Sequence, residues 1–572
     1  MTDYTTAHYD LEETRGKQMI VLDTFKRVAE SIANDVIPAS REDVAISGIE
    51  NPASSLSSSG NKYTTLPLRP VSKDVNFIYN NYLHGRFLLN FSLNSYSDSA
   101  ATTASDLPSD LSVAIHTQPM TQALPSRIQL MCGNSIIWQN QFQRQEALVS
   151  FASLPQELVE TSNECFTCSK AVNHHAIPGS YQIIGSSQKT STGVYSISFI
   201  HDFTIDLNRL TPLLSNLPFT LVQSGDLRLR VFFENLDEAY AITPLNDTNT
   251  NNNTSLNETN FHVISPQPMN KLFAVKFPTT QAIASASNTI AAGTAGATRY
   301  IKANLVAWQA VDMGLEIIQS NFSIKTDSLR AISDYLKTDN KFVIPTQTWS
   351  TSLATNKPTS QTGEIVWQIS AYNIYLLAFL FPYDNAWTTY SPTPPLTSID
   401  IMLNSKSINY LTYKNFDGRV IKDTIQAFVN DDKYGANESL LESLNLPIAS
   451  DGSGYDATAY LTKFSDKGGN VQYSPNTFVI AKGLSPPNCF EKGYCYASSN
   501  PQNSQVRFKY QWQTGLDNGS ATNTLNANMA LTATNAPPMC LALQDCCLVL
   551  NYDPVNDTCQ SGSIIFAEPS VI

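Results

Sequence analysis

Leu111–Pro119 (LSVAIHTQP) and Ile374–Pro382 (IYLLAFLFP) are two apolar runs that each read as a β-strand ending at a proline. Each is followed by the same order of patterns: a short apolar strand, an Asn-Ser turn and a stretch with helical spacing. The first series consists of Ile128–Met131, Asn134-Ser135 and a helix carrying Ala147, Leu148 and Phe151. The second consists of Ile399–Met402, Asn404-Ser405 and a helix carrying Ile421, Ile425 and Phe428. The matching order predicts an internal duplication, although few letters are identical and chance resemblance is the alternative.

Two further stretches, Leu227–Phe233 (LRLRVFF) and Val506–Trp512 (VRFKYQW), alternate apolar and polar side chains over most of their length. A strand with one core face and one solvent face requires this period of two. The first stretch therefore predicts that Leu227, Leu229 and Val231 face a core. Because clusters of Pro, Asn, Gly and Ser separate such runs from about residue 65 onward, we expect an all-β fold. Large antiparallel sheets must hide their edges, as the two packed sheets of a jelly roll do.

Three segments of the body depart from the β pattern. Gln143–Glu160 reads as a helix that Pro155 bends or divides. Gly418–Val429 reads as a second helix with Asp417 as its N-cap, and Ser328–Lys337 as a shorter one. The two longer helices each follow one of the duplicated strand series, so we expect one helix in a loop of each β unit.

Residues 1–64 are predicted to form an N-terminal arm. Leu22–Val36 has apolar side chains at helical spacing, and Pro38 ends that helix. The helix either packs on its own domain or docks on a neighbouring subunit or another partner. The Ser-rich stretch 51–62 (NPASSLSSSGNK) is expected to be flexible.

The rest of the chain divides into two β units on the basis of composition. The first is expected at 65–245 and the second, with a C-terminal tail, at 263–572. An Asn- and Thr-rich linker or loop at 246–262 separates them. Each unit is longer than a small β-barrel, which leaves room for long surface loops.

Charge is scarce in this sequence. The 572 residues include 36 Lys and Arg and 49 Asp and Glu, for a net charge of −13, and charged residues make up 15% of the chain. An ordinary soluble protein has roughly 25%, so we expect other subunits to cover much of the surface. The acidic balance argues against direct binding of nucleic acid over a broad face. We also expect neither a transmembrane helix nor a secretory signal, because no apolar run of sufficient length occurs.

The cysteines supply the one candidate metal site. Cys165 and Cys168, spaced as CxxC, precede His174 and His175, and these four side chains could bind zinc tetrahedrally. The spacing is not that of a standard zinc finger, so unpaired thiols or a local disulfide are the alternatives, and we predict no metal and no cofactor. The later cysteines are expected to be buried thiols, or else to form disulfides after release into an oxidising medium. They are Cys489, Cys495, Cys540, Cys546, Cys547 and Cys559.

Catalytic signatures are missing from the sequence. No HExxH, GxSxG or GxGxxG motif occurs, and the seven histidines are scattered along the chain. The sequence therefore predicts a protein that is not an enzyme.

The duplicated series, with a helix after each (Ile128–Phe151 and Ile399–Phe428), resembles the double jelly-roll major capsid proteins of the PRD1–adenovirus lineage. That group includes virophages, Polinton-like viruses and large DNA viruses of eukaryotes. The resemblance covers about residues 65–560 and rests on architecture, chain length and the lack of a catalytic motif rather than on a short diagnostic motif. It implies two tandem eight-stranded jelly rolls, each with a short helix in one loop, preceded by the N-terminal helical arm.

The resemblance also implies how such a protein works. Three copies, with two jelly rolls each, would form a pseudo-hexagonal homotrimeric capsomer that tiles an icosahedral virion shell inside the infected cell. Its partners would be itself, neighbouring capsomers, penton proteins and minor capsid or cement proteins, with no direct contact to nucleic acid. The alternative is a β-sandwich protein of the virion surface that binds a receptor or a carbohydrate, and a carbohydrate-active enzyme is a third possibility.

Overall fold

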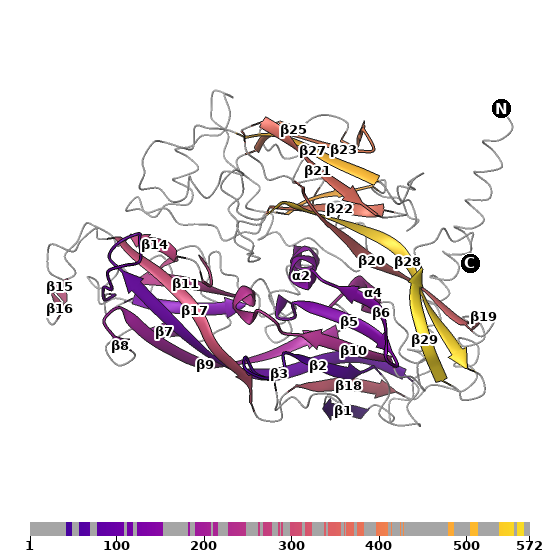
Figure 1. Cartoon of the computed structure of the whole chain (residues 1–572), viewed down its shortest axis with the longest axis horizontal. Coiled ribbons are helices and arrows are strands. Elements are labelled where there is room, and N and C mark those ends of the chain that lie inside the picture. Colours follow the sequence, from indigo (N-terminus) through magenta and orange to yellow (C-terminus); the bar gives the residue numbers. More distant parts are fainter. Residues whose placement is uncertain are drawn as a thin grey trace.

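The structure is a computed structural model of the whole chain. It describes residues 42–47, 56–68, 77–107, 111–117, 123–152, 181–183, 189–207, 210–215, 227–247, 261–263, 267–270, 272–276, 284–285, 288–289, 298–311, 315–322, 337–338, 341–355, 360, 362–370, 374–381, 396–409, 413–414, 424, 427, 479–484, 504–512, 537–553 and 558–565. Figure 1 shows two bodies of β-strands, with helix α2 (Gln143–Ala152) between them. Within the described ranges, no helix is both long enough and apolar enough to cross a membrane.

The second body has the strand order of a jelly roll. Its first strand β20 pairs with its last, β28, the second strand β21 pairs with β27, the third strand β22 with β26, and β23 with β24. Further pairing gives two sheets in the orders β20-β28-β22-β26 and β21-β27-β23-β24. Such nested antiparallel pairs arise when one long hairpin rolls up into two sheets. The strands are β20 (Lys341–Leu353), β21 (Thr362–Ile369), β22 (Ile374–Leu380), β23 (Leu396–Leu403), β24 (Lys406–Ser407), β26 (Val479–Gly483), β27 (Ser504–Trp512) and β28 (Met539–Asp553).

The first body repeats these sheet orders. β2, β10, β5 and β6 form a sheet in the order β2-β10-β5-β6, as β21, β27, β23 and β24 do. β11 pairs with β4 and β4 with β7, as β28 pairs with β22 and β22 with β26. β3 and β9 pair with each other in a further sheet. These strands are β2 (Tyr63–Pro67), β3 (Phe77–Tyr96), β4 (Leu111–Thr117), β5 (Arg127–Cys132), β6 (Ser135–Asn140), β7 (Tyr181–Ile183), β9 (Val194–Asp206), β10 (Leu227–Phe232) and β11 (Tyr240–Asp247).

The strand pairing confirms the all-β fold and the duplication in the strands that the sequence matched. β4 and β22 hold the same place in their sheets, and so do β5 and β23. The match between the strands that begin near Leu227 and Val506 is confirmed as well, because β10 lies between β2 and β5 as β27 lies between β21 and β23.

The sheet of β3 reaches beyond the first stretch of chain. The edge of β3 that faces away from β9 pairs with β17 (Thr298–Ala310) and β18 (Glu316–Phe322). β14 (Leu272–Lys276) extends this sheet beside β17, and β1 (Glu42–Ser47) extends it beside β18. Strands on both sides of residue 263, where the sequence places the start of the second unit, therefore share one sheet.

Period-two burial places the core where the alternation predicts it. Leu227, Leu229 and Val231 of β10 are fully buried, whereas Arg228 and Arg230 between them are partly exposed. This confirms the predicted core face of β10. Leu229 lies in register with Leu66 of β2 and Leu130 of β5, both also fully buried.

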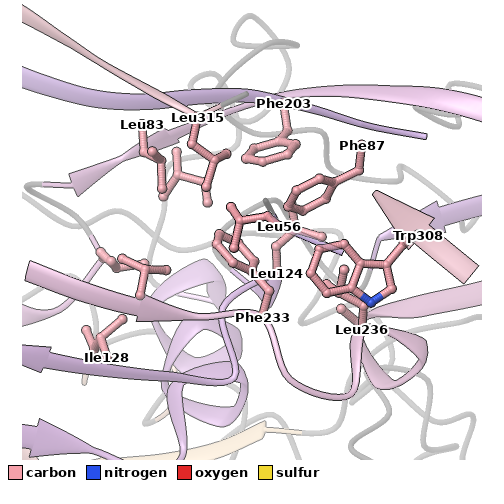
Figure 2. Packing of buried hydrophobic residues seen from close by; sticks show 14 of the residues in the cluster. Leu56, Leu83, Phe87, Leu124, Ile128, Phe203, Phe233, Leu236, Trp308 and Leu315 are labelled. Carbon is pink, nitrogen blue, oxygen red and sulfur yellow. The ribbon is translucent and has the colours of Figure 1, made fainter. Parts of the chain in front are cut away.

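Aromatic rings fill the space between the two layers of the first unit (Figure 2). The ring of Phe87 lies 5.0 Å from that of Phe203 and 5.2 Å from those of Phe233 and Trp308, measured between centroids. Such tilted and edge-on pairs add to the free energy that burial supplies. Gly85 leaves the space on β3 that the ends of the Leu315 and Phe203 side chains occupy, so a Cβ atom there would force both to shift.

The second unit has its own aromatic centre. Trp367 of β21 and Phe508 of β27 meet Phe379 of β22, so both sheets contribute to it. The indole nitrogen of Trp367 donates a hydrogen bond to the carbonyl oxygen of Pro538 at 3.0 Å. Its one polar atom is therefore paired although the whole side chain is buried.

Some of the sequence-based predictions can be compared with the structure and others cannot. Helix α2 begins at Gln143, as predicted, and is described to Ala152. Most of the predicted helix at Gly418–Val429 and all of the one at Leu22–Val36 lie outside the described residues. The predicted helix at Ser328–Lys337 also lies outside them except for Lys337, which is in strand β19 (Lys337–Thr338). Leu56, in the stretch expected to be flexible, is fully buried, and its carbonyl oxygen accepts a hydrogen bond from Ala310 N at 3.0 Å.

His201 of β9 is a buried titratable group in this core. Its Nδ1 lies 2.9 Å from the hydroxyl of Tyr240, while its Nε2 has no hydrogen-bond partner in the described structure. Burial lowers the pKa of His201 from 6.5 to about 4, and the attraction of Asp202 offsets this only in part. The imidazole is therefore neutral at neutral pH, as a buried ring with a single partner should be.

We expect His201 to make the first unit sensitive to acid. Between pH 6.5 and about 4 the unfolded chain binds the extra proton and the folded chain does not, so stability is full above pH 6.5 and falls as the pH drops towards 4. The loss should reach about 3 kcal/mol. The measurement is the thermal midpoint of wild type and His201→Phe from pH 7.5 to 4.5. The partly exposed His84, changed to Gln, is the control. Equal slopes for wild type and His201→Phe would contradict the assignment.

Candidate functional site

Side chains of the two β units meet in a buried contact. Helix α2 follows β6 of the first unit and lies against the β20-β28-β22-β26 sheet of the second (Figure 1). An apolar cluster joins them. Its members are Ala123, Ala147 and Val149 from the first unit and Leu376, Ala378, Leu380, Ala481, Met539 and Leu541 from the second.

A buried carboxyl group sits in this contact. Glu146 of α2 receives hydrogen bonds from Asn140 Nδ2 at 2.5 Å and from the hydroxyl of Thr351 on β20 at 3.3 Å. Burial raises the pKa of Glu146 well above its usual range, although both hydrogen bonds act in the opposite direction. The bond to Thr351 links the first turn of α2 directly to the second unit.

Arg144, two residues earlier, ties the same turn to the first unit. It is 4% exposed, and its guanidinium pairs with Glu238 at 2.9 Å. It also donates to the carbonyl oxygens of Ala123 at 3.1 Å and Glu234 at 2.9 Å. Burial lowers the pKa of Arg144 and the charge of Glu238 raises it, but an arginine stays a cation in a protein. The charge is therefore both paired and hydrogen-bonded.

Two neighbouring interactions extend this contact between the units. The hydroxyl of Thr346 on β20 donates to the carbonyl oxygen of Leu213 in helix α4 (Pro212–Ser215) at 3.2 Å. Farther along, Cys546, Leu548 and Leu550 of β28 belong to the same apolar cluster as the core of the first unit. β28 is a strand of the second unit that also packs into the core of the first. This shared packing fixes the relative position of the two units.

Two features of the described residues bear on the metal-binding and carbohydrate-related alternatives. No group of three or more His, Cys, Asp or Glu that could hold a metal occurs among them. A shallow depression lies over β21 and β27, lined by Glu364, Lys509, Ser398 and the largely buried Tyr510. It brings together neither the pair of carboxylates that a glycosidase needs nor an exposed aromatic groove of the kind expected in a carbohydrate-binding protein.

The candidate zinc ligands Cys165, Cys168, His174 and His175 lie outside the described residues, as do Cys489 and Cys495. Of the later cysteines, Cys540, Cys546 and Cys547 are buried, as one of the two alternatives predicts. Sequence reasoning missed Arg144 and Glu146. The polar run Gln143–Glu146 reads as a solvated first turn, and the local pattern holds no signal that this turn is buried.

Comparisons with known proteins were made at the levels of family, sequence and structure. No protein-family model and no curated protein matches the chain. Among solved structures, the Sputnik virophage structure at 3.5 Å resolution is 10% identical, with a TM-score of 0.43 over 94% of this chain and 91% of that one. The PBCV-1 VP54 structure fitted into a Sputnik reconstruction is 10% identical, with a TM-score of 0.42 over 92% and 97%. The Faustovirus major capsid protein is 9% identical, with a TM-score of 0.41 over 88% and 89%. Because these scores are below 0.5, the fold assignment rests on the strand pairing.

Proposed function

We propose that this protein is the major capsid protein of an icosahedral virus. The observation that supports the proposal best is that each chain holds two units with the same order of strands in their sheets, joined by a buried contact. Three such chains around a threefold axis would place six similar units in a ring, which is a shape that tiles a shell.

The chemistry of the chain fits a structural role. A protein that acts by touching copies of itself needs surfaces on which few charges lose water, since unpaired buried charge is costly. Only 15% of the residues are charged, and the net charge is −13. The proposal therefore places the protein in the virion shell, with itself, penton proteins and minor capsid or cement proteins as partners, and with no direct contact to nucleic acid.

The test is the mass of the purified full-length chain, measured by size-exclusion chromatography with light scattering. We expect a mass near three times that of one chain, and an interface well above the ~1,600 Å² of a standard contact. A single chain at every concentration would contradict the proposal and favour a receptor- or carbohydrate-binding protein. A glycan array would then test that alternative.

A further inference from the structure

One sheet face of the first unit carries the two most exposed large apolar side chains in the described part of the chain. Val306 of β17 is 64% exposed and Ile200 of β9 is 57% exposed. Both strands flank β3: Ile200 lies in register with Leu88, and Val306 lies in a bulge where β17 shifts register opposite Asn90 and Phe91. Two exposed apolar groups thus lie close together across one strand.

The side chains around them are uncharged, and most are polar. Ser198, Asn90 and Ala307 lie in one row across the three strands, and Ser196, Ser92 and Asn304 lie in another. Among the described residues of these three strands, outward-facing charges appear only beyond these rows, at Arg86 and Asp202 towards one end and at Lys302 towards the other. We call this surface the β3 face, defined by Ile200, Val306, Ser196, Ser198, Asn90 and Asn304. An apolar centre within an uncharged polar surround is the composition of a protein interface.

We propose that the β3 face is a contact surface for a second copy of this chain; the inference rests on the proposed function. Each copy carries a net charge of −13, so two copies repel each other within the Debye length of about 8 Å. An uncharged face allows the closest approach at the lowest electrostatic cost. Serine and asparagine both donate and accept hydrogen bonds, so the polar surround can be satisfied by another such protein surface. Nucleic acid or an anionic membrane would instead require a basic face.

The experiment introduces charge at the centre of the β3 face. The double variant Ile200→Glu, Val306→Glu is expected to reduce the mass measured by light scattering from the assembled form to one chain, with the far-ultraviolet circular dichroism unchanged. A milder pair, Ile200→Ser and Val306→Ser, covers the case that the Glu variant folds poorly. It should weaken association at least about tenfold by removing two apolar contacts. The matched control is Ile136→Glu, at a residue of β6 that is 50% exposed, and it should keep the wild-type mass.

The outcomes separate this inference from the proposed function. If wild type assembles and both double variants assemble equally well, the β3 face is not the contact, while the capsid proposal stands. If Ile136→Glu dissociates the assembly as well, the effect is not specific to the β3 face and the inference is wrong. If wild type itself remains a single chain, the proposed function fails first.

Discussion

Leu229→Asp is expected to yield no folded protein. Leu229 is fully buried between Leu66 and Leu130, in the middle strand of the trio β2-β10-β5. Losing its apolar contacts alone costs about 2–5 kcal/mol, and a carboxylate in this place adds a desolvation cost with no partner nearby. The sum is comparable to the whole stability of a typical domain, about 5–15 kcal/mol.

Soluble yield and resistance to limited proteolysis measure this effect. The control is Arg228→Asp, one residue earlier, where the side chain is partly exposed on the opposite face of β10. We expect this variant to accumulate and to resist proteolysis almost as wild type does. A well-folded Leu229→Asp protein would show that the face of β10 has been assigned to the wrong side.

Arg144→Met is expected to lower the free energy of unfolding by about 3–5 kcal/mol, the range for breaking a buried ion pair by removing one partner. The change leaves Glu238 without its cation and leaves the carbonyl oxygens of Ala123 and Glu234 without this donor. Because α2 also contacts the second unit, the loosened helix should separate the unfolding of the two units. Calorimetry would show this as two thermal transitions where wild type shows one.

A matched ion pair at the surface provides the control. Arg86 pairs with Asp202 at 2.8 Å, but both side chains are about half exposed, so Arg86→Met should cost no more than about 1 kcal/mol. Adding Glu238→Gln to Arg144→Met should restore part of the loss, because the unpaired charge disappears. Equal losses for Arg144→Met and Arg86→Met would rule out a special role for the buried pair.

The strands and their core faces were accessible from the sequence because their signal is local. In β10, each apolar residue is followed two positions later by another, and nothing beyond the strand is needed to see which face is buried. The duplication was accessible for a similar reason, since each unit repeats a strand, a turn and a helix within a short stretch of chain.

The choice of strand partners could not be predicted from the sequence. β3 pairs with β17 and β18, more than 200 residues later, although composition places a boundary at 246–262 between them. Backbone hydrogen bonds are alike for any two strands, so they carry no information about which strand pairs with which. Side-chain packing makes that choice, as at Gly85, where the missing side chain leaves room for Leu315 and Phe203 against β3.

The contact between α2 and the second unit shows most clearly which properties the sequence determines and which the tertiary structure decides. The sequence alone settled that a helix begins at Gln143, that it lies in a loop of the first β unit, and that its first turn is polar, because propensity and periodicity act over a few residues. The chain's three-dimensional packing settled that this polar turn is buried, with Arg144 bound to one unit and Glu146 to the other. Whether a residue is buried depends on which distant parts of the chain pack against it. A polar segment has the same sequence whether water or a second sheet covers it.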